Sequence, residues 1–369
     1  MKITDVTLKM FLWDGFKPVV YGPNVRSNAT SSEIGLVEIS TDEGVSGFSF
    51  LGASYSSASQ DAQRFIDMIK PVLMGENPLE REKLHKRMWG RHRGAGVRAV
   101  AAADVALWDL AGRAAGMPIH ALLGTYRDSI LAYISSPAHE TNEGYVEEVL
   151  HWKERGAKAY KLHIPLPWQR DVAACTAVRD AVGPDFTLML DASWAYDYPT
   201  AIKVGRALEE LDFLWLEDPL GEWEVSNYVK LKQKLSIPLM ATELPFAGLE
   251  TYSVWLMAQA TDYLRGGVAA KGGITNAIKT AHLAEAFGMN YEIHHGMNSI
   301  NNVANLHVAM AIRNCDYLEV VTPEANNKYG LVEDLEIDRD GLIHAPTEPG
   351  LGVEIDFDFI EKRKLAILS

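Results

Sequence analysis

The sequence predicts an α/β fold in which a closed (β/α) barrel carries a smaller module made of strands followed by helices. Eight strand-like apolar runs alternate with helical segments after about residue 125, and their C-terminal ends lie roughly 25 to 30 residues apart. Eight such parallel βα units in about 200 residues fit a closed barrel better than an open sheet. The residues before 125 show a different order, with strand patterns first and helical patterns after them.

The first module begins with strand-like alternation in residues 1–7. Two further β-type runs, 34–40 and 45–50, flank a turn at 41–44 in which Asp and Gly supply the turn geometry. The Ala-rich stretch 97–115 has a wide apolar face and predicts a buried helix. This part of the chain is therefore expected to form an α+β module.

The barrel strands are expected at the eight apolar runs, which are residues 130–134, 159–164, 187–190, 213–216, 238–242, 262–268, 290–294 and 317–320. From about residue 326 the chain is rich in Gly and Pro, and we expect it to leave the barrel and pack back on the first module. The expected domains are therefore 1–125, 126–325 and 326–369.

Composition excludes several classes of function. The net charge of −14 argues against a nucleic-acid-binding surface, which needs a basic patch. No apolar run of about 18 residues occurs, and no basic-then-apolar leader is recognised, so we expect no membrane span. The two cysteines, Cys175 and Cys315, lack the spacing of metal ligands and are expected to be reduced thiols. These features favour a cytoplasmic globular enzyme.

Acidic residues follow three successive barrel strands. Asp191, Glu217 and Glu243 each come directly after an apolar run, and the C-terminal ends of barrel strands face the active site. Three carboxylates that converge on one point repel one another unless a cation lies among them. An all-oxygen ligand set favours Mg²⁺ over zinc. A strand-end acid can also cap the next helix, but three at this spacing favour a metal site.

Basic and further acidic groups lie at the ends of other strands. Lys161 and His163 point to the same side of the second strand, because side chains alternate along a strand. Either alone is compatible with a solvated lysine or a structural histidine, but beside a metal they are expected to transfer protons. For His294 and His295, the same alternation predicts that one faces away from the site. Glu319, on the eighth strand, is expected to be functional.

An ordered set of motifs resembles a known family. The segments VEISTDEGVSG (37–47), DVALWDLAG (104–112), LEDP (216–219), KGGIT (271–275) and PGLGV (349–353) occur in this order. Together they are similar to motifs of the enolase superfamily, and within it of the mandelate racemase-like group of sugar-acid dehydratases. The resemblance runs nearly from end to end of the chain.

The resemblance implies an α+β capping domain on a modified (β/α)₇β TIM-like barrel. It also implies Mg²⁺ held by Asp191, Glu217 and Glu243, and removal of the proton α to a substrate carboxylate to give an enediolate. Glu319 matches the acid that hydrogen-bonds that carboxylate, and it would have to be protonated to donate. The family association further suggests a homo-oligomer, either a dimer or an octamer.

Three positions depart from the family pattern. The second-strand motif usually has two lysines, whereas here its second position is His163, a competent base near neutral pH. Counting from Gly273 places His294 at the seventh-strand histidine and Gly267 where an aspartate normally orients it. His294 is therefore oriented by another group or acts only as an acid. Ser193 occupies a position where asparagine is common.

These departures favour β-elimination over racemisation, which needs two matched bases. We expect dehydration of an aldonic or aldaric sugar acid to a 2-keto-3-deoxy acid, in which Lys161 or His163 takes the α-proton and His294 protonates the departing 3-hydroxyl. The alternatives are a racemase or epimerase, a lactone or anhydrosugar cycloisomerase, and a catalytically silent metal-binding barrel. The residues expected to contact the substrate are Ser193, His295, Trp13 and Tyr55, the last two in loops of the first module.

Overall fold

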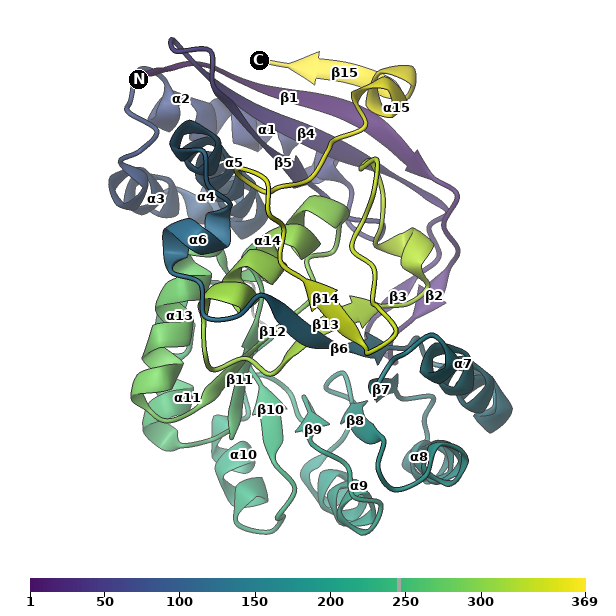
Figure 1. Ribbon diagram of the computed structural model, residues 1–369. Coiled ribbons are helices and arrows are strands. Elements are labelled where there is room, and N and C mark those ends of the chain that lie inside the picture. Colours follow the sequence, from purple (N-terminus) through teal and green to yellow (C-terminus); the bar gives the residue numbers. More distant parts are fainter. Residues whose placement is uncertain (244–246) are drawn as a thin grey trace.

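The computed structural model describes residues 1–243 and 247–369, which form a sheet-and-helix cap on a closed barrel (Figure 1). The cap is built on a four-stranded antiparallel sheet with the order β15-β1-β4-β5. Its strands are β1 (Ile3–Asp14), β4 (Ser31–Thr41), β5 (Ser46–Leu51) and β15 (Lys364–Leu368). A separate two-stranded ribbon is formed by β2 (Val19–Val20) and β3 (Arg26–Ser27).

Helices cover one face of the cap sheet, and the predicted helix over 97–115 is present as the longest of them, α5 (Val97–Ala115). Helix α5 approaches β5 closely, because a Cβ added to Gly47 would lie 2.2 Å from the carbonyl oxygen of Ala106. The other helical segments of the cap are η1 (Ala58–Gln60), α1 (Ala62–Arg64), the π-helical turn η2 (Phe65–Ile69), α2 (Lys70–Leu73), α3 (Arg81–Trp89), α4 (His92–Ala95) and α6 (Ile119–Leu123).

The predicted barrel is confirmed. Eight parallel strands follow one another around it, and pairing of the last with the first closes it. All eight lie at the predicted apolar runs, with ends shifted by up to a few residues. They are β6 (Ser129–Ser135), β7 (Ala159–His163), β8 (Thr187–Asp191), β9 (Leu216–Glu217), β10 (Leu239–Ala241), β11 (Tyr263–Gly266), β12 (Asn290–Ile293) and β13 (Tyr317–Val321).

Helices surround the barrel, and the ring contacts the cap through α12, α13 and α14. The helical segments are α7 (Asn142–Glu154), α8 (Trp168–Val182), α9 (Tyr198–Glu210), α10 (Val225–Lys232), η3 (Leu249–Thr251), α11 (Ser253–Ala258), α12 (Val268–Lys271), α13 (Ile274–Ala286) and α14 (Ser299–Ala311).

The chain after the barrel contacts both parts of the molecule. After η4 (Glu324–Asn326), strand β14 (Leu342–His344) pairs antiparallel with β6 of the barrel. Helix α15 (Phe357–Lys362) then leads into β15, which pairs antiparallel with β1 of the cap. The two chain ends therefore lie at the cap (Figure 1).

One buried contact joins the cap to the barrel and explains a sequence motif. The carboxylate of Asp104, on α5, accepts hydrogen bonds from the Thr275 backbone N–H at 2.9 Å and from the Thr275 hydroxyl at 2.7 Å. Gly273 has φ of 100°, and a Cβ there would lie 2.3 Å from an Asp104 carboxylate oxygen. The Gly-Gly element after β11 is therefore required by the close approach of α5.

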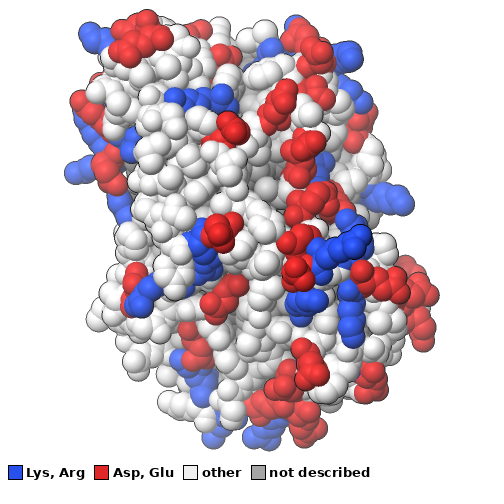
Figure 2. Space-filling view, in the orientation of Figure 1, with Lys and Arg blue, Asp and Glu red and all other residues white. Residues whose placement is uncertain are grey.

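Three further observations bear on the class of protein. None of the helices in the described part of the chain has the length and apolarity that a membrane crossing needs. Acidic and basic side chains are interspersed on the face shown in Figure 2, where no extended basic area is seen. Cys175 and Cys315 are both buried free thiols.

Candidate active site

A cavity of about 220 Å³ lies where the C-terminal ends of the barrel strands meet loops of the cap. Residues from six barrel strands or the loops after them reach it, as do two cap loops, one between β2 and β3 and one after β5. The lining residues are Tyr21, Asn24, Val25, Tyr55, Ser135, Lys161, His163, Asp191, Ser193, Trp194, Glu243, His294, His295, Met297, Glu319 and Val321. Most residues predicted for the site therefore share one cavity.

Lys161 is buried among three carboxylates. Its Nζ lies 3.2 Å from Asp191 Oδ2, 2.9 Å from Glu217 Oε2 and 3.0 Å from Glu319 Oε1. Burial alone would lower the pKa of this ammonium, but Glu217 and Glu319 outweigh burial and hold the pKa well above its usual value. The ammonium donates hydrogen bonds to Asp191 and Glu217 and forms an ion pair with Glu319, so Lys161 offsets part of the negative charge of these acids.

A second buried cation, Arg265, completes this network, and sequence reasoning missed it. Its Nε lies 2.8 Å from Glu217 Oε1, and its Nη2 lies 2.6 Å from Glu319 Oε2. Its Nη1 donates to the carbonyl oxygen of Ile293 at 3.2 Å. Arg265 is fully buried on β11, beneath the cavity rather than in its wall. An arginine inside a short strand carries no motif of its own, so only the fold reveals its partners.

The three predicted acids converge. Asp191, Glu217 and Glu243 offer carboxylate oxygens that all lie within 4.8 Å of one another. Burial would raise the pKa of Asp191, but Lys161 and His163 outweigh it and hold that pKa below its usual range. Glu217 is completely buried, and its burial raises its pKa even though Arg265 and Lys161 oppose this.

The donor set fits a hard divalent cation. Four carboxylates, those of the three convergent acids and of Glu319, face two permanent cations, Lys161 and Arg265. The excess of buried negative charge and the all-oxygen composition suit Mg²⁺. The structure therefore contains a candidate metal centre at the strand ends where the sequence predicts one.

His163 is held in a defined orientation next to Lys161. Its Nδ1 lies 2.6 Å from the carbonyl oxygen of Ser136, which directs Nε2 into the cavity, 3.2 Å from Asp191 Oδ2. Tyr21 from the cap packs edge-on against the imidazole, with ring centroids 5.2 Å apart. The lysine and the histidine therefore lie side by side, as predicted. They differ in their contacts, because the Lys161 ammonium has three carboxylate neighbours whereas His163 Nε2 has one.

Glu319 differs from the expectation that it carries a proton. Burial would raise its pKa, but Arg265 and Lys161 outweigh burial and hold the pKa well below its usual range. Its Oε2 also accepts a hydrogen bond from the His295 backbone N–H at 2.8 Å. These contacts favour the ionised form of Glu319 in this arrangement. Its role as a hydrogen-bond donor to a substrate carboxylate stays a prediction.

His294 and His295 both line the cavity, whereas the sequence predicts that one of them faces away. Strand β12 ends at Ile293, so the alternation of side chains ends before the two histidines. Their ring centroids lie 4.1 Å apart. Burial lowers the pKa of His295 well below its usual value, and the neighbouring His294 adds to this effect.

The structure also shows what replaces the aspartate expected near His294. A Cβ at Gly267 would lie 2.5 Å from the His294 carbonyl oxygen, so no larger side chain fits there. Asn305, on α14, donates to that carbonyl at 2.7 Å and accepts from the Val268 N–H at 2.9 Å. Glu243 lies 3.1 Å from His294 Nε2, while His294 Nδ1 has no hydrogen-bond partner in residues 1–243 and 247–369. Asn305, which sequence reasoning missed, therefore fixes the backbone at His294, and Glu243 contacts the His294 imidazole ring.

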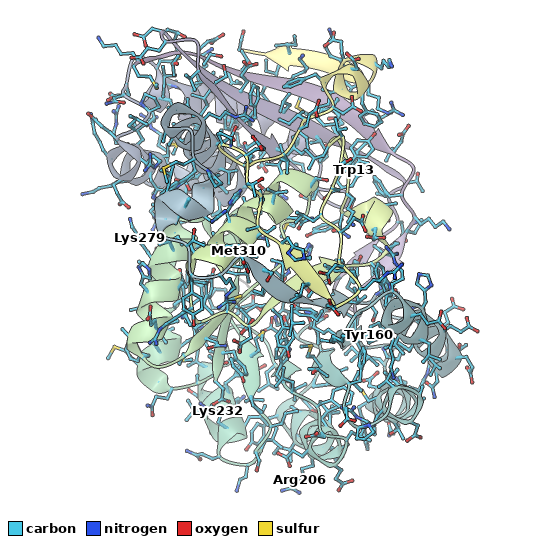
Figure 3. All side chains as sticks on the ribbon, viewed as in Figure 1. Trp13, Tyr160, Arg206, Lys232, Lys279 and Met310 are labelled. Carbon is cyan, nitrogen blue, oxygen red and sulfur yellow. The ribbon has the colours of Figure 1, made fainter. Side chains whose placement is uncertain are left out.

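The remaining predicted residues fall into two groups. Ser193 and Tyr55 line the cavity with His295, and the Ser193 backbone N–H donates to Asp191 Oδ1 at 2.8 Å. Trp13 does not reach the cavity. Strand β1 continues through Asp14, and the Trp13 ring is buried in the cap, stacked on Tyr329 at a centroid distance of 4.9 Å (Figure 3). The expectation of a substrate contact at Trp13 is corrected, because this residue belongs to the strand and not to a loop.

Comparison with known proteins gives consistent matches over both parts of the chain. Residues 144–359 match the family model described as enolase C-terminal domain-like. Residues 16–124 match the model for the mandelate racemase / muconate lactonizing enzyme N-terminal domain. The two matched regions follow the division between the cap and the barrel.

Individual relatives carry different reaction names. The chain is 30% identical over 320 residues to the L-talarate/galactarate dehydratase of Salmonella typhimurium, covering 83% of this chain and 77% of that protein. It is 27% identical over 365 residues to the D-galactarolactone cycloisomerase of Agrobacterium fabrum, covering 89% and 91%. The solved structure of D-glucarate dehydratase from Agrobacterium tumefaciens complexed with magnesium aligns with a TM-score of 0.87 and 35% identity, covering 99% and 100%.

Proposed function

Because the chain belongs to the mandelate racemase / muconate lactonizing enzyme family of the enolase superfamily, we propose that it dehydrates a sugar acid in the presence of Mg²⁺. In this reaction the proton α to the carboxylate is removed, and water is then eliminated to give a 2-keto-3-deoxy acid. The observation that carries the proposal is that His163 and Lys161 share one cavity with Asp191 and Glu243, while the third convergent acid, Glu217, lies beneath that cavity against Lys161. The dehydratases among its relatives support the same reaction class.

Asp191, Glu217 and Glu243 would hold the cation. When bound, Mg²⁺ supplies positive charge that stabilises the negative charge developing on the substrate carboxylate. Lys161 and Arg265 hold the surrounding carboxylates in place through the contacts described above. The magnesium in the structure of the related D-glucarate dehydratase supports this choice of metal.

His163 is our candidate for the base. Its Nδ1 contact with Ser136 fixes the ring and leaves Nε2 directed into the cavity, where it can take the α-proton. Lys161 is placed differently, because three carboxylates surround its ammonium and leave no free direction toward a substrate. Lys161 is therefore proposed as the cation that orders the acids.

His294 is our candidate for the acid. Its ring lines the same cavity as His163 but comes from β12, five strands further along the barrel from β7. The C2–H bond breaks with its proton transferred to His163, and the C3–O bond breaks with a proton supplied by His294, so that water leaves. The resulting enol then tautomerises to the 2-keto acid.

A cycloisomerase is the second candidate, because one relative of comparable coverage carries that name. It would use the same removal of the α-proton but would release no water. The product therefore distinguishes the two reactions, while exchange of the α-proton with solvent reports the step that they share.

The test is to incubate the protein with Mg²⁺ and a panel of aldonic and aldaric acids in D₂O. We expect a 2-keto acid from at least one acid, and α-proton exchange that His163→Asn lowers by about 10³-fold. His294→Asn should retain exchange but lose dehydration. The matched control is His344→Asn, an exposed histidine on β14 that should behave as the parent protein. Exchange without a 2-keto acid would favour the cycloisomerase, and no exchange with any acid would contradict both enzymes.

A further inference from the structure

The cavity has two walls of different chemistry. We call the floor the titratable residues Lys161, His163, Asp191, Glu243, His294 and Glu319 at the strand ends. We call the roof the cap-loop residues Tyr21, Asn24, Val25 and Tyr55 together with Trp194 and Met297, which follow β8 and β12. The roof consists of aromatic, aliphatic and amide side chains.

No roof residue is charged, and two arginines that lie near it in sequence or in space, Arg26 and Arg98, are engaged elsewhere. Arg26, next to Val25, lines a separate groove with Arg170. Arg98 pairs through Nη2 with Asp61 at 2.7 Å and donates through Nη1 to the Ser56 hydroxyl. The three residues that the structure does not describe are Leu, Pro and Phe in the sequence, so none of them carries a charge.

The reacting carboxylate of a substrate belongs at the floor, because the candidate metal ligands are there. The rest of the substrate must then contact the roof. A second carboxylate in that position would lose water without gaining a cation, which is strongly unfavourable. Hydroxyl groups would instead find the Asn24 amide and the phenols of Tyr21 and Tyr55 as partners.

The floor is not the source of this discrimination. Its acids Asp191, Glu243 and Glu319, with buried Glu217, would be balanced by Lys161, Arg265 and a bound Mg²⁺. The choice between one and two substrate carboxylates is therefore assigned to the roof.

We propose that the site selects a monocarboxylic sugar acid, of the aldonic class, and rejects the corresponding aldaric diacid. This inference rests on the proposed function, and it assigns specificity to the absence of a cation in the roof. Discrimination by an unpaired charge is an effective way to reject an analogue of similar size.

The test compares matched pairs that differ only in the terminal carbon, such as D-gluconate with D-glucarate and D-galactonate with galactarate, in the presence of Mg²⁺. We expect kcat/KM for the better aldonate to exceed that of its diacid partner by about 100-fold or more. A diacid that reacts within ten-fold of the best aldonate would overturn the proposal.

A binding measurement separates this proposal from the proposed function. If no acid is turned over, the dehydratase assignment fails, and calorimetric titration of the same pairs into the Mg²⁺-loaded protein decides the specificity. Tighter binding of the aldonate supports the proposal. Equal binding, tighter binding of the diacid, or binding of neither overturns it.

A roof variant tests the physical cause. Val25→Arg adds a cation to the roof, and Val25→Gln is the matched uncharged control. The arginine variant should raise the ratio of diacid to aldonate affinity by about ten-fold relative to the glutamine variant. An equal ratio in the two variants would contradict the assignment of the roof to the far end of the substrate.

Discussion

The floor and the roof of the cavity come from different parts of the fold and differ in how much the fold constrains them. Floor residues lie on or directly after barrel strands or, like Glu243, close behind one, and each contacts at least one other floor residue through a carboxylate paired with the lysine or a histidine. Roof residues lie on loops and are held by few bonds, such as that from the Tyr21 hydroxyl to the Thr322 carbonyl oxygen at 2.7 Å. Because substitutions in the roof leave the ionic network of the floor in place, substrate specificity can change while the reaction chemistry is kept.

The largest expected effect comes from breaking the floor at its candidate metal. Chelation of divalent ions, or Asp191→Asn, should lower α-proton exchange by about 10³-fold or more, because the charge that develops on the substrate carboxylate then lacks its stabilising cation. NMR in D₂O measures the exchange, and added Mg²⁺ should restore it only in the chelated parent protein. Undiminished exchange after chelation would remove the metal from the mechanism.

Removal of the buried Arg265 guanidinium should destabilise the protein, because the acids at and beneath the floor lose a cation, whereas the roof should change little. Arg265→Met leaves Glu217 and Glu319 with Lys161 as their remaining cation, and the free energy of unfolding should fall by about 3–5 kcal/mol. Urea denaturation measures the loss. Arg265→Lys is the matched variant that keeps the charge, and it should lose less. Equal stability of Arg265→Met and the parent protein would show that the network contributes no stability.

Glu292 is a buried acid of the barrel that differs from the floor carboxylates, because the donors that hold it are uncharged. Glu292, on β12, accepts hydrogen bonds from the Asn290 amide and from the backbone N–H groups of Asp316 and Tyr317. Burial raises its pKa to about 7, and the Asp316 carboxylate contributes in the same direction. The folded state therefore binds this proton more tightly than the unfolded state, whose carboxyl has the ordinary, lower pKa.

The sign of the resulting pH dependence follows from that difference. The stability associated with the Glu292 proton is complete below the unfolded pKa and is lost as pH rises through the folded pKa of about 7. Glu292→Gln removes this loss, so at pH 8 it should be more stable than the parent by up to about 3 kcal/mol, and near pH 4 the gain should vanish. Thermal unfolding across pH measures the difference. A gain in stability of Glu292→Gln that does not change with pH would have a cause other than the Glu292 proton.

The smallest expected effect is in the roof. Tyr21→Phe removes one hydroxyl and its hydrogen bond to Thr322, which should cost about 1 kcal/mol of stability and change KM for a sugar acid by less than about ten-fold, with little change in kcat. Steady-state kinetics and urea denaturation measure the two quantities. A fall in kcat of the size expected for the floor variants would show that the two walls are not separable.

Sequence reasoning was most successful where one local pattern carries the information. Apolar runs located all eight barrel strands, and polar residues directly after those runs placed Asp191, Glu243, Lys161 and His163 in the cavity. Strand geometry makes this possible, because parallel strands in a closed barrel all end on the same side. Residue type and position then suffice to bring these groups together.

The same reasoning failed where a residue's surroundings are contributed by distant segments. Arg265 meets Glu319, which is 54 positions away in the chain, and Asn305 on α14 bonds to His294 at the end of β12. Trp13 and the pair His294 and His295 were misplaced for a simpler reason, because the ends of β1 and β12 decide which side chains still alternate. Strand ends depend on pairing with neighbours that a local pattern does not include.

The chain's own pattern of apolar runs and strand-end acids was enough to predict the barrel, the candidate metal ligands and the pair Lys161 and His163. Only the tertiary structure decided which cations surround Glu319, that Asn305 holds the backbone at His294 where Gly267 replaces an aspartate, and the absence of charge from the described roof. Periodicity reports which face of an element is buried, whereas protonation and specificity depend on the groups that other elements bring within a few ångströms.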